Sequence, residues 1–337
     1  MCHNLVGDRN DWEAIYNLKL DEFRNEDEKL ILNKTQRNSL EVFGVTTVES
    51  LAMTPIRDLK KLPGMGETSI LKSVRKAQEI TFKDNFRTAS DIHDERKKTV
   101  KFLTTGSKAF DKLLGGGIET KSITEIAGAN GSGKTEMCKQ LSVNVQLPEN
   151  EGGLGGNALY FDTEDTFRSV RVSQMVLAKG MDVEKTLNNI TVACCYTSDH
   201  QIFLVKRCDD IIASRNIKLV IVDSVMAHFR NEYIGREALG PRQQELNNHI
   251  KKLKGLAKTF DVAIVVTNQA ISNPSGFGAG LIAAGGNILG HGSTTRLFLK
   301  RPRSMAPERV AELTKSPWLP SGQVAFKITG NGVEDSS

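Results

Sequence analysis

Long apolar segments are missing from this chain of 337 residues. No apolar run approaches the roughly 18 residues that a helix needs to cross a membrane, so no membrane association is expected. The first eight residues have neither a basic start nor a long apolar stretch, and they are not expected to act as a secretory signal. A hydrophobic content of 39% with 25% charged residues indicates a soluble, globular protein instead.

Cysteine is scarce, with five residues, an odd number, and no C-x-x-C pair among them. This usage fits a reducing, intracellular compartment, either the cytoplasm or the nucleus, with buried thiols at Cys194 and Cys195. Excess charge is small as well, because 45 basic residues stand against 40 acidic ones. The net charge of +5 is compatible with a nucleic-acid partner but does not require one.

The length favours two domains. Residues 1–30 are polar and acidic, which predicts a loosely ordered lead-in or one surface helix. Apolar residues recur at helical spacing over 31–79 and predict a small all-α domain, whereas 80–99 has the charged, weakly periodic composition of a linker. Over 100–337, near-continuous apolar runs alternate with helical stretches. That alternation predicts an α/β fold whose mostly parallel sheet is covered on both faces.

A glycine turn, Leu-Pro-Gly-Met-Gly, stands inside the small domain at 62–66. It is typical of a helix-hairpin-helix motif, because Gly64 and Gly66 allow a tight hairpin whose N–H groups bind a phosphate without reading bases. Nearby positive charge comes from Lys60, Lys61, Lys72 and Arg75. Pro-Gly-x-Gly is also an ordinary turn signal, so a plain connection between helices is the alternative.

A glycine-rich phosphate loop is the strongest motif of the chain. It matches G-x-x-x-x-G-K-[ST] at every fixed position and comprises Gly128, Ala129, Asn130, Gly131, Ser132, Gly133, Lys134 and Thr135. An apolar run precedes the loop and a helix-like stretch follows it, so that backbone N–H groups and the helix N-terminus converge on phosphate oxygens. Lys134 would reach the β and γ phosphates, and Thr135 would bind Mg²⁺. A chance glycine turn is the alternative.

Three of the apolar runs end in residues suited to nucleotide chemistry, at the edge where parallel sheets bind ligands. Asp223 ends the most apolar run and would help to hold Mg²⁺, or else only starts a turn. Glu164 would polarise the water that attacks the γ phosphate, or else cap the next helix. Gln269 can hydrogen-bond the γ phosphate and report its loss.

Two stretches are candidates for binding a polynucleotide. Residues 228–242 interleave arginines with an aromatic, which suits a phosphate backbone as well as it suits a solvated basic loop: Arg230, Tyr233, Arg236 and Arg242. Residues 271–290 are dominated by small and polar residues with one aromatic, Phe277, a composition that predicts a mobile segment without a core. Because this stretch is attached to Gln269, the state of the bound nucleotide would control a distant ligand that the stretch holds.

These motifs, in this order, resemble those of the RadA/RecA recombinases, most closely archaeal RadA and its eukaryotic strand-exchange relatives. The resemblance extends over residues 35–335. Besides the phosphate loop it rests on Leu-Thr-Thr-Gly-Ser (103–107), Leu-Leu-Gly-Gly-Gly-Ile-Glu-Thr (113–120), Asp-Thr-Glu (162–164) with Thr-Phe-Arg (166–168), Ile-Val-Asp-Ser (221–224), Thr-Asn-Gln (267–269), Gly-Gly-Asn-Ile-Leu-Gly-His (285–291) and Ser-Thr-Thr-Arg (293–296).

The resemblance implies a RecA-like P-loop ATPase core that binds ATP and Mg²⁺ between neighbouring subunits of a helical filament or ring. Arg171 would stack on the adenine of its own subunit. Three residues would reach the nucleotide of the neighbouring subunit: His291, Lys315 and Pro320.

Self-association and DNA binding follow from the same resemblance. Phe86 and Ala89 match the F-x-x-A polymerisation motif, so Phe86 would dock into the next subunit rather than fold back on its own domain. Loops 229–242 and 271–290 would hold single-stranded DNA, and the helix-hairpin-helix would handle duplex DNA. The implied function is DNA-dependent ATPase activity with homologous pairing and strand exchange, assisted by recombination mediators. The alternatives are a recombinase paralogue that assists without exchanging strands and, more distantly, a hexameric helicase or clock-type ATPase.

Two positions depart from the pattern of these relatives in a way that bears on the chemistry. Asp165, where relatives usually carry Gly, adds a carboxylate beside Glu164. Lys315 stands where archaeal relatives usually have Asp, an acid associated with a monovalent cation near the γ phosphate. A lysine ammonium would replace that cation, which predicts ATPase activity with little dependence on potassium.

Overall fold

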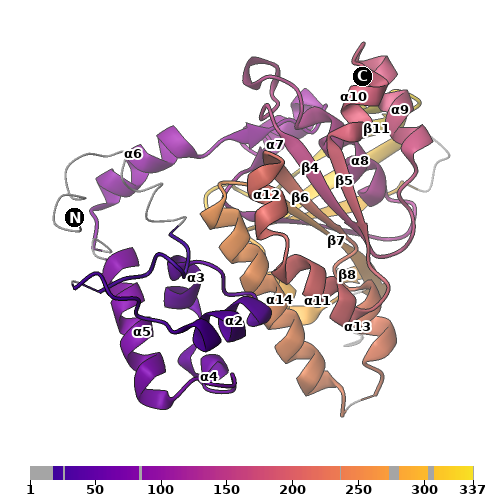
Figure 1. The fold of residues 1–337 in the computed structure, drawn as a ribbon. Coiled ribbons are helices and arrows are strands. Elements are labelled where there is room, and N and C mark those ends of the chain that lie inside the picture. Colours follow the sequence, from indigo (N-terminus) through magenta and orange to yellow (C-terminus); the bar gives the residue numbers. More distant parts are fainter. Residues whose placement is uncertain are drawn as a thin grey trace. The chain divides into compact units, whose positions relative to one another are not determined.

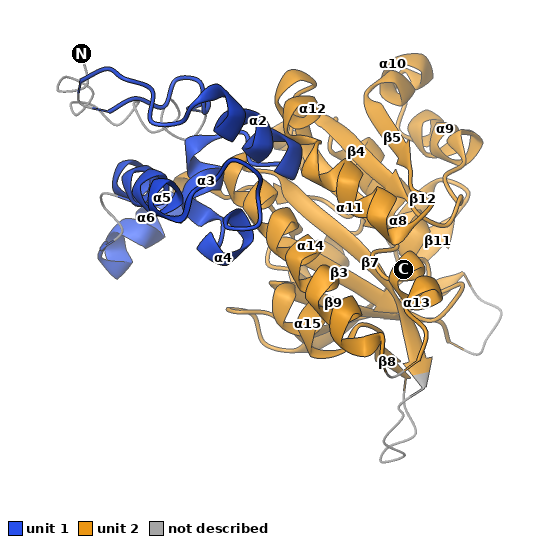
Figure 2. Cartoon of the chain, turned by 60° about the horizontal axis from the view of Figure 1, so that its bottom comes forward, with its two compact units in different colours: residues 1–97 blue, residues 98–337 orange. Residues whose placement is uncertain are grey.

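The computed structural model describes residues 18–25, 27–82, 86–235, 237–272, 281–302 and 307–336. The chain divides into two compact units, residues 1–97 and 98–337 (Figure 2). Among the helices of the described ranges, none combines the length and the apolar character that a membrane span requires.

Unit 1 is a bundle of short helices: α2 (Lys34–Phe43), α3 (Val48–Met53), α4 (Ile56–Leu59), α5 (Glu67–Thr81) and most of α6 (Ala89–Thr99). Their boundaries follow local signals. Asn33 forms a capping box with Gln36 at the start of α2, and Gly44, with φ of 89°, ends that helix in the left-handed conformation. Leu40, Leu51 and Val74 are buried in one shared core.

Residues 18–30 differ from the expected lead-in, whose first part, residues 1–17, lies outside the described residues. Leu20 and Phe23 are fully buried in the same core as Leu32 and Leu40, within the stretch that was expected to be loosely ordered up to residue 30. The two apolar side chains stand three residues apart, and the acidic residues around them remain exposed. The acidic composition of the segment therefore concealed a short piece of core.

The predicted hairpin lies between α4 and α5. Gly64 has φ of +75°, a conformation that glycine adopts without strain, and Gly66 is the N-cap of α5. Met65 between them is buried in the core, whereas both glycines are exposed. Lys60 is paired with Glu67, so part of the predicted positive charge is neutralised within the hairpin.

Helix α6 and the residue before it differ from the rest of unit 1. None of the side chains of α6 is buried, and Thr88 and Asp91 bond each other's backbone N–H groups at its start. Phe86 is fully exposed, with a relative accessibility of 105%, so it does not pack on its own unit. Ala89, also exposed, is the first residue of the helix.

Unit 2 is built on a large sheet (Figure 1). The strand order is β12-β11-β10-β9-β3-β7-β6-β4-β5, with β8 beside β7. All pairs from β9 to β5 are parallel, and the others are antiparallel. The bounds are β3 (Ile123–Gly128), β4 (Asn157–Asp162), β5 (Ile190–Cys194), β6 (Ile217–Asp223), β7 (Ala263–Ser272), β8 (Leu281–Ala283), β9 (Thr295–Lys300), β10 (Glu308–Lys315), β11 (Gly322–Thr329) and β12 (Gly332–Asp335), and a separate pair is formed by β1 (Phe102–Leu103) and β2 (Ile118–Glu119).

Two hydrophobic cores cover opposite faces of the sheet. On β4, Tyr160 belongs to one core, and Leu159 and Phe161 belong to the other. The helices of unit 2 are α7 (Lys108–Leu113), α8 (Lys134–Asn144), α9 (Ser169–Ala178), α10 (Val183–Asn188), α11 (Ser198–Lys206), α12 (Asp209–Ser214), α13 (Ala227–Glu232), α14 (Leu239–Thr259) and α15 (Gly286–Gly292). The predicted α/β fold with a mostly parallel, doubly covered sheet is confirmed.

Two loop predictions need correction. Residues 228–242 begin inside α13, and α14 starts at Leu239, so the irregular part is short. The stretch 271–290 was expected to be mobile and without a core. It contains the end of β7, strand β8 and most of α15, while residues 273–280 lie outside the described residues and the expected mobility stays a prediction. Ala284 and Leu289 are buried, because the few apolar residues of this stretch meet elements that are distant in sequence.

Candidate nucleotide-binding site

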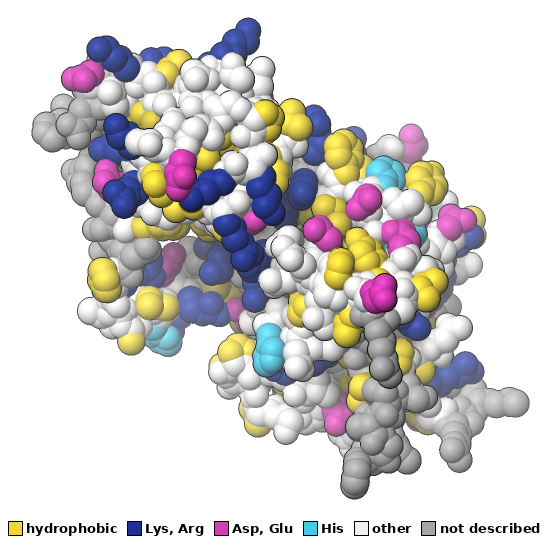
Figure 3. Space-filling model, turned by 90° about the horizontal axis from the view of Figure 1, so that it is seen from below, with side chains coloured by type: hydrophobic (Ala, Val, Ile, Leu, Met, Phe, Trp, Pro, Cys, Tyr) yellow, Lys and Arg dark blue, Asp and Glu magenta, His cyan; other side chains and the backbone are white. Residues whose placement is uncertain are grey.

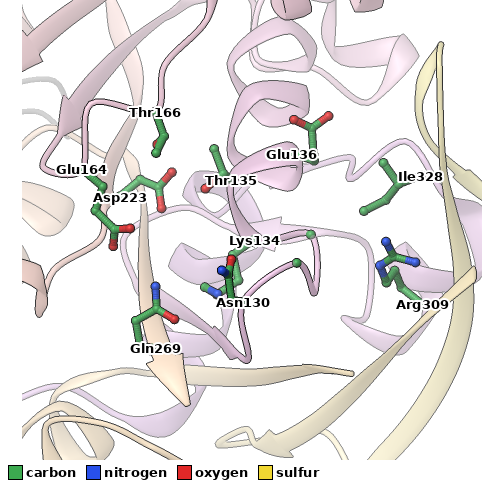
Figure 4. A pocket seen from close by; sticks show the side chains of 12 residues that line it. Asn130, Lys134, Thr135, Glu136, Glu164, Thr166, Asp223, Gln269, Arg309 and Ile328 are labelled. Carbon is green, nitrogen blue, oxygen red and sulfur yellow. The ribbon is translucent and has the colours of Figure 1, made fainter. Parts of the chain in front are cut away.

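The register of the parallel strands brings the predicted site together. Gly128, at the end of β3, pairs with Gln269 of β7, and Asp162 at the end of β4 pairs with Asp223 at the end of β6. A pocket of about 250 Å³ lies at this edge, lined by Lys134, Thr135, Glu164, Asp223 and Gln269 among others (Figure 4). With Asn130, Gly131 and Gly133 of the phosphate loop, eight of the predicted residues therefore share one pocket.

Glycines shape the loop between β3 and α8. Gly131 and Gly133 have φ of +72° and +104°, and a Cβ atom at Gly133 would lie 2.3 Å from Cδ1 of Ile328. Ser132 is fully buried, and its hydroxyl has no hydrogen-bond partner among the described residues. A cradle that excludes side chains and holds an unsatisfied buried hydroxyl fits a bound phosphate group.

Lys134 opens α8 and lies at the centre of the pocket. Its Nζ donates to the carbonyl oxygens of Gly128, at 2.9 Å, and Ala129, at 3.0 Å. Burial lowers the pKa of the Lys134 ammonium, and the carboxylates of Asp223 and Glu164 partly offset this effect. The ammonium therefore sits between loop carbonyls and carboxylates, and it is the positive group that can attract phosphate oxygens here.

Asp223 is held on both carboxylate oxygens. Oδ2 accepts a hydrogen bond of 2.6 Å from the hydroxyl of Tyr160, and Oδ1 accepts from the hydroxyl of Thr267. Burial and the Asp223 charge raise the pKa of Tyr160 well above its ordinary value, so the phenol remains a donor. Neither Tyr160 nor Thr267 was predicted, because only the strand register places them beside Asp223.

Glu164 stands in a loop that is organised from both sides. Its Oε1 accepts a hydrogen bond of 2.6 Å from the hydroxyl of Ser224. The carboxylate of Asp162 accepts from the backbone N–H groups of Thr166, at 3.1 Å, and Phe167, at 2.9 Å. Asp162 was also missed as a site residue, although an Asp followed by a short polar turn is a recognisable loop-organising signal.

Asp165 points away from this arrangement. Its side chain is 92% exposed and lies 3.7 Å from Arg168. Over the ranges that the structure describes, no group of three or more His, Cys, Asp and Glu side chains is placed to hold a metal ion. The oxygen ligands that fit Mg²⁺ here are the Thr135 hydroxyl and the Asp223 carboxylate, with phosphate oxygens supplying others.

Two arginines stand near the other end of the pocket, one as a lining residue and one, Arg171, only through its bond to the lining residue Glu136. Arg171, from α9, donates to Glu136 at 2.6 Å and to the carbonyl oxygens of Thr329 and Gly330, which hold its guanidinium in one plane beside the pocket. Arg309, from β10, lines the pocket itself (Figure 4). Burial and the charge of Arg301 lower the pKa of Arg309. Glu136 and Arg309 are lining residues that the sequence motifs did not single out.

The residues expected to serve a neighbouring subunit lie elsewhere in unit 2. His291, on α15, and Pro320 are exposed. Lys315, at the end of β10, donates to the carbonyl oxygens of Gly290, at 2.8 Å, and Ser293, at 2.7 Å. None of the three lines the pocket of its own chain.

The candidates for DNA contact are only partly described. Arg230 is exposed on α13, and Arg242 is half-buried on α14. Tyr233 stacks on Phe229, with ring centroids 6.2 Å apart. Two further candidates, Arg236 and Phe277, lie outside the described residues. Lys and Arg side chains are interspersed with apolar ones on the face shown in Figure 3.

The fold and pocket define the class of protein. A glycine loop after one central strand, an acid ending another and a glutamine within a third, on a mostly parallel sheet, form a RecA-like P-loop ATPase core. The sequence model of the Rad51 family matches residues 95–336. The chain is 46% identical over 304 residues to the DNA repair and recombination protein RadA of Metallosphaera sedula, which covers 89% of this chain and 92% of that protein. The chain belongs to the Rad51 family of RadA/RecA recombinases.

Proposed function

We propose that this chain hydrolyses ATP in a DNA-dependent manner, forms filaments on single-stranded DNA and exchanges strands with a homologous duplex. Its family makes it an ATP-dependent recombinase of homologous recombination, and the proposal assigns the individual steps to residues. The observation that carries it is the convergence of Lys134, Thr135, Glu164, Asp223 and Gln269 on one pocket. We expect this role inside the cell, where the DNA is, with mediator proteins as further partners.

Phosphate binding is assigned to the loop and the first turn of α8. Backbone N–H groups of the glycine loop and the buried Ser132 hydroxyl would bind phosphate oxygens, and Lys134 would exchange its loop carbonyls for the β and γ phosphates. Thr135 and Asp223 would hold Mg²⁺, which supplies charge neutralisation when bound. Arg171, with its guanidinium plane fixed by Glu136 and two carbonyls, offers a flat surface for adenine.

Hydrolysis is assigned to Glu164. Its Oε1 is bonded to Ser224, which leaves Oε2 to orient a water molecule toward the γ phosphate and to accept its proton. We propose that hydrolysis resets the filament and that pairing itself needs only bound ATP.

Gln269 would transmit the state of the pocket to DNA. It stands beside the first glycine of the phosphate loop, and its carbonyl oxygen accepts from Ala284 N–H at 2.9 Å. Strand β7 continues from Gln269 to Ser272 and pairs with β8, so the base of the 271–290 segment is attached directly to it. Together with Arg230 and Arg242, this segment would hold single-stranded DNA through phosphate contacts, with affinity that falls steeply with salt.

Self-association is assigned to Phe86 and Ala89. Phe86 is fully exposed, and β5 is the last strand of the sheet in the described part of the chain. Apolar side chains are exposed on β5 and near it, including Val192, Tyr196 and Phe203. An unpaired strand edge with apolar side chains is a surface that a second copy can cover. The F-x-x-A segment of one subunit would dock there on the next.

Strand exchange by the purified protein alone is the experiment that tests this function. We expect ATP-dependent conversion of homologous single-stranded and duplex substrates, with filaments visible by electron microscopy. The exposed F-x-x-A segment favours this function over that of an assisting paralogue, which would bind ATP without exchanging strands. Closed rings with no joint molecules would point to the helicase-like alternative.

A further inference from the structure

A buried charged cluster lies beside the pocket without entering it. Glu125, on β3 of unit 2, is completely buried, and its carboxylate accepts hydrogen bonds from three side chains. Arg296 of β9 donates through Nε at 2.6 Å and Nη2 at 3.3 Å, Asn268 of β7 donates at 2.8 Å, and Ser293 donates at 3.2 Å. None of the four lines the pocket.

The contacts of Asn268 lead to the γ-phosphate end of the pocket. Asn268 immediately precedes Gln269, and its Nδ2 donates both to Glu125 and to the carbonyl oxygen of Ala284, at 2.7 Å. Only the nitrogen end of the amide can serve two acceptors, and Oδ1 has no hydrogen-bond partner among the described residues. Glu125 and Ala284 therefore fix the orientation of the Asn268 side chain. Because Gln269 is the next residue of β7, the same contacts fix the position of Gln269.

The contacts of Ser293 lead away from Gln269, to helix α15 and to Lys315. Ser293 is the C-cap of α15, the helix that carries His291, and it is 1% exposed. Its hydroxyl is within reach of Glu125 and of the Leu289 carbonyl oxygen, and its own carbonyl oxygen accepts from Lys315 Nζ. The N-terminal side of the same helix follows Ala284, which Asn268 holds. Glu125 thus fastens α15 at both ends.

A buried ion pair is poor evidence for stability, since desolvation consumes most of the attraction, and its best-attested use is to enforce one arrangement. Here the arrangement joins β3 to three places far along the chain: β7, the C-cap of α15 and β9. We propose that Glu125 is a positioning residue for two nucleotide sites at once: it sets Gln269 in its own pocket, and it sets α15 and Lys315 toward the nucleotide of the neighbouring subunit. The second part rests on the proposed function, which assigns His291 and Lys315 to that neighbour.

Coupling between successive sites follows from this arrangement. A shift of Gln269 on loss of the γ phosphate moves Asn268. Through Glu125, this movement changes the position of α15, the helix that faces the nucleotide of the next subunit. Occupancy of one site is then linked to occupancy of the next, and the link works in both directions.

The test uses Glu125→Gln, which keeps size but removes charge, with Glu312→Gln as the matched control. Glu312 is also a strand glutamate paired with a cation, Lys300, at 2.5 Å, but it is partly exposed. The first readout is the ratio of ATP to ADP affinity, measured with labelled nucleotides in the full chain carrying Phe86→Glu, which keeps it unassembled. The second readout is the Hill coefficient for ATP in DNA-stimulated hydrolysis by the assembling chain.

We expect Glu125→Gln to reduce the ATP:ADP ratio about tenfold, the size of one lost hydrogen bond to a charged group, with ADP affinity unchanged. The Hill coefficient should fall toward unity, and Glu312→Gln should change neither readout. Two milder variants test the two parts of the proposal separately. Asn268→Ser should lower the ATP:ADP affinity ratio, and Ser293→Ala should lower the Hill coefficient. They also keep the proposal testable if Glu125→Gln folds poorly.

Equal losses of ATP and ADP affinity in Glu125→Gln would overturn the proposal, because they would mean general damage to the pocket. So would a Hill coefficient unchanged in both Glu125→Gln and Ser293→Ala. Absence of DNA-stimulated hydrolysis in the unsubstituted chain would instead overturn the proposed function and, with it, the assignment to the neighbouring site.

Discussion

The pocket and the surfaces assigned to neighbouring subunits are organised in opposite ways. In the pocket, Asp223, Glu164 and Lys134 are each bonded by groups of the same chain. Phe86, His291 and Pro320, by contrast, are exposed. Under the proposed function, the residues that carry out the chemistry are preorganised within one subunit, whereas Phe86, His291 and Pro320 are left open for a second copy to cover. This difference predicts which variants act on the isolated chain and which act only on the assembly.

Lys134→Ala should have the largest effect, because it removes the ammonium that lines the pocket, the only one there in the described part of the chain. We expect ATP-dependent assembly on single-stranded oligonucleotides to disappear and hydrolysis to fall at least about a hundredfold, as for loss of a preorganised charge. Filament formation would be followed by electron microscopy with and without ATP. If assembly were the same as in the unsubstituted chain under both conditions, the nucleotide would not control DNA binding.

Glu164→Gln should separate hydrolysis from assembly. Loss of a general base costs about a hundred- to ten-thousandfold in turnover, while the amide keeps the bond to the Ser224 hydroxyl. Filaments formed with ATP should persist longer than those of the unsubstituted chain. Turnover reduced less than tenfold would assign the base to another residue, and Asp165→Asn serves as the exposed carboxylate control.

Phe86→Glu should disrupt the interface between subunits and leave the pocket intact. Removal of a central aromatic anchor costs about 2–4 kcal/mol of association, so we expect monomers in sedimentation and no filaments. ADP affinity of the isolated chain should be unchanged. Val42→Glu is the matched control, since Val42 is an exposed apolar residue of the same unit, with a relative accessibility of 84%. Equal disruption by both variants would deny a specific role to Phe86.

Tyr160→Phe should produce a smaller change within the pocket. It deletes the 2.6 Å bond to Asp223 Oδ2 while Thr267 still holds Oδ1. We expect the Mg²⁺ concentration for half-maximal hydrolysis to rise about tenfold, as for one hydrogen bond to a charged group, with little change in ATP affinity without Mg²⁺. Tyr196→Phe, at an exposed tyrosine, should have no such effect.

Exchange of potassium for a bulky inert cation should have the smallest effect near neutral pH. Lys315 holds a fixed charge against the carbonyls of Gly290 and Ser293. Burial, followed by Arg296 and Lys254, lowers the pKa of Lys315, so its charge is lost at a lower pH than that of an ordinary lysine. Potassium stimulation of the DNA-dependent ATPase should therefore emerge as the pH rises. Strong potassium dependence near neutral pH would contradict the replacement.

Sequence reasoning located the pocket but not its supporting bonds. The phosphate loop, Asp223 and Gln269 could be predicted because each follows an apolar strand at a place where local spacing carries the signal. Glu125 and Tyr160 could not, since each stands within a run that reads as ordinary strand, and their partners come from strands that are distant in sequence. The burial of Leu289 could likewise not be predicted from the composition of 271–290. Leu289 belongs to the core that also contains Ile250 of α14.

By itself, the sequence determined the family, the phosphate-loop motif and the division into a helical unit and an α/β unit, because each depends on short-range patterns. Only the tertiary structure decided which hydroxyls hold Asp223 and Glu164, and that one buried carboxylate joins Asn268, Ser293 and Arg296. The physical reason is register: in a parallel sheet, strands far apart in the chain are aligned residue by residue, and a shift of one residue would turn each of these side chains to the other face.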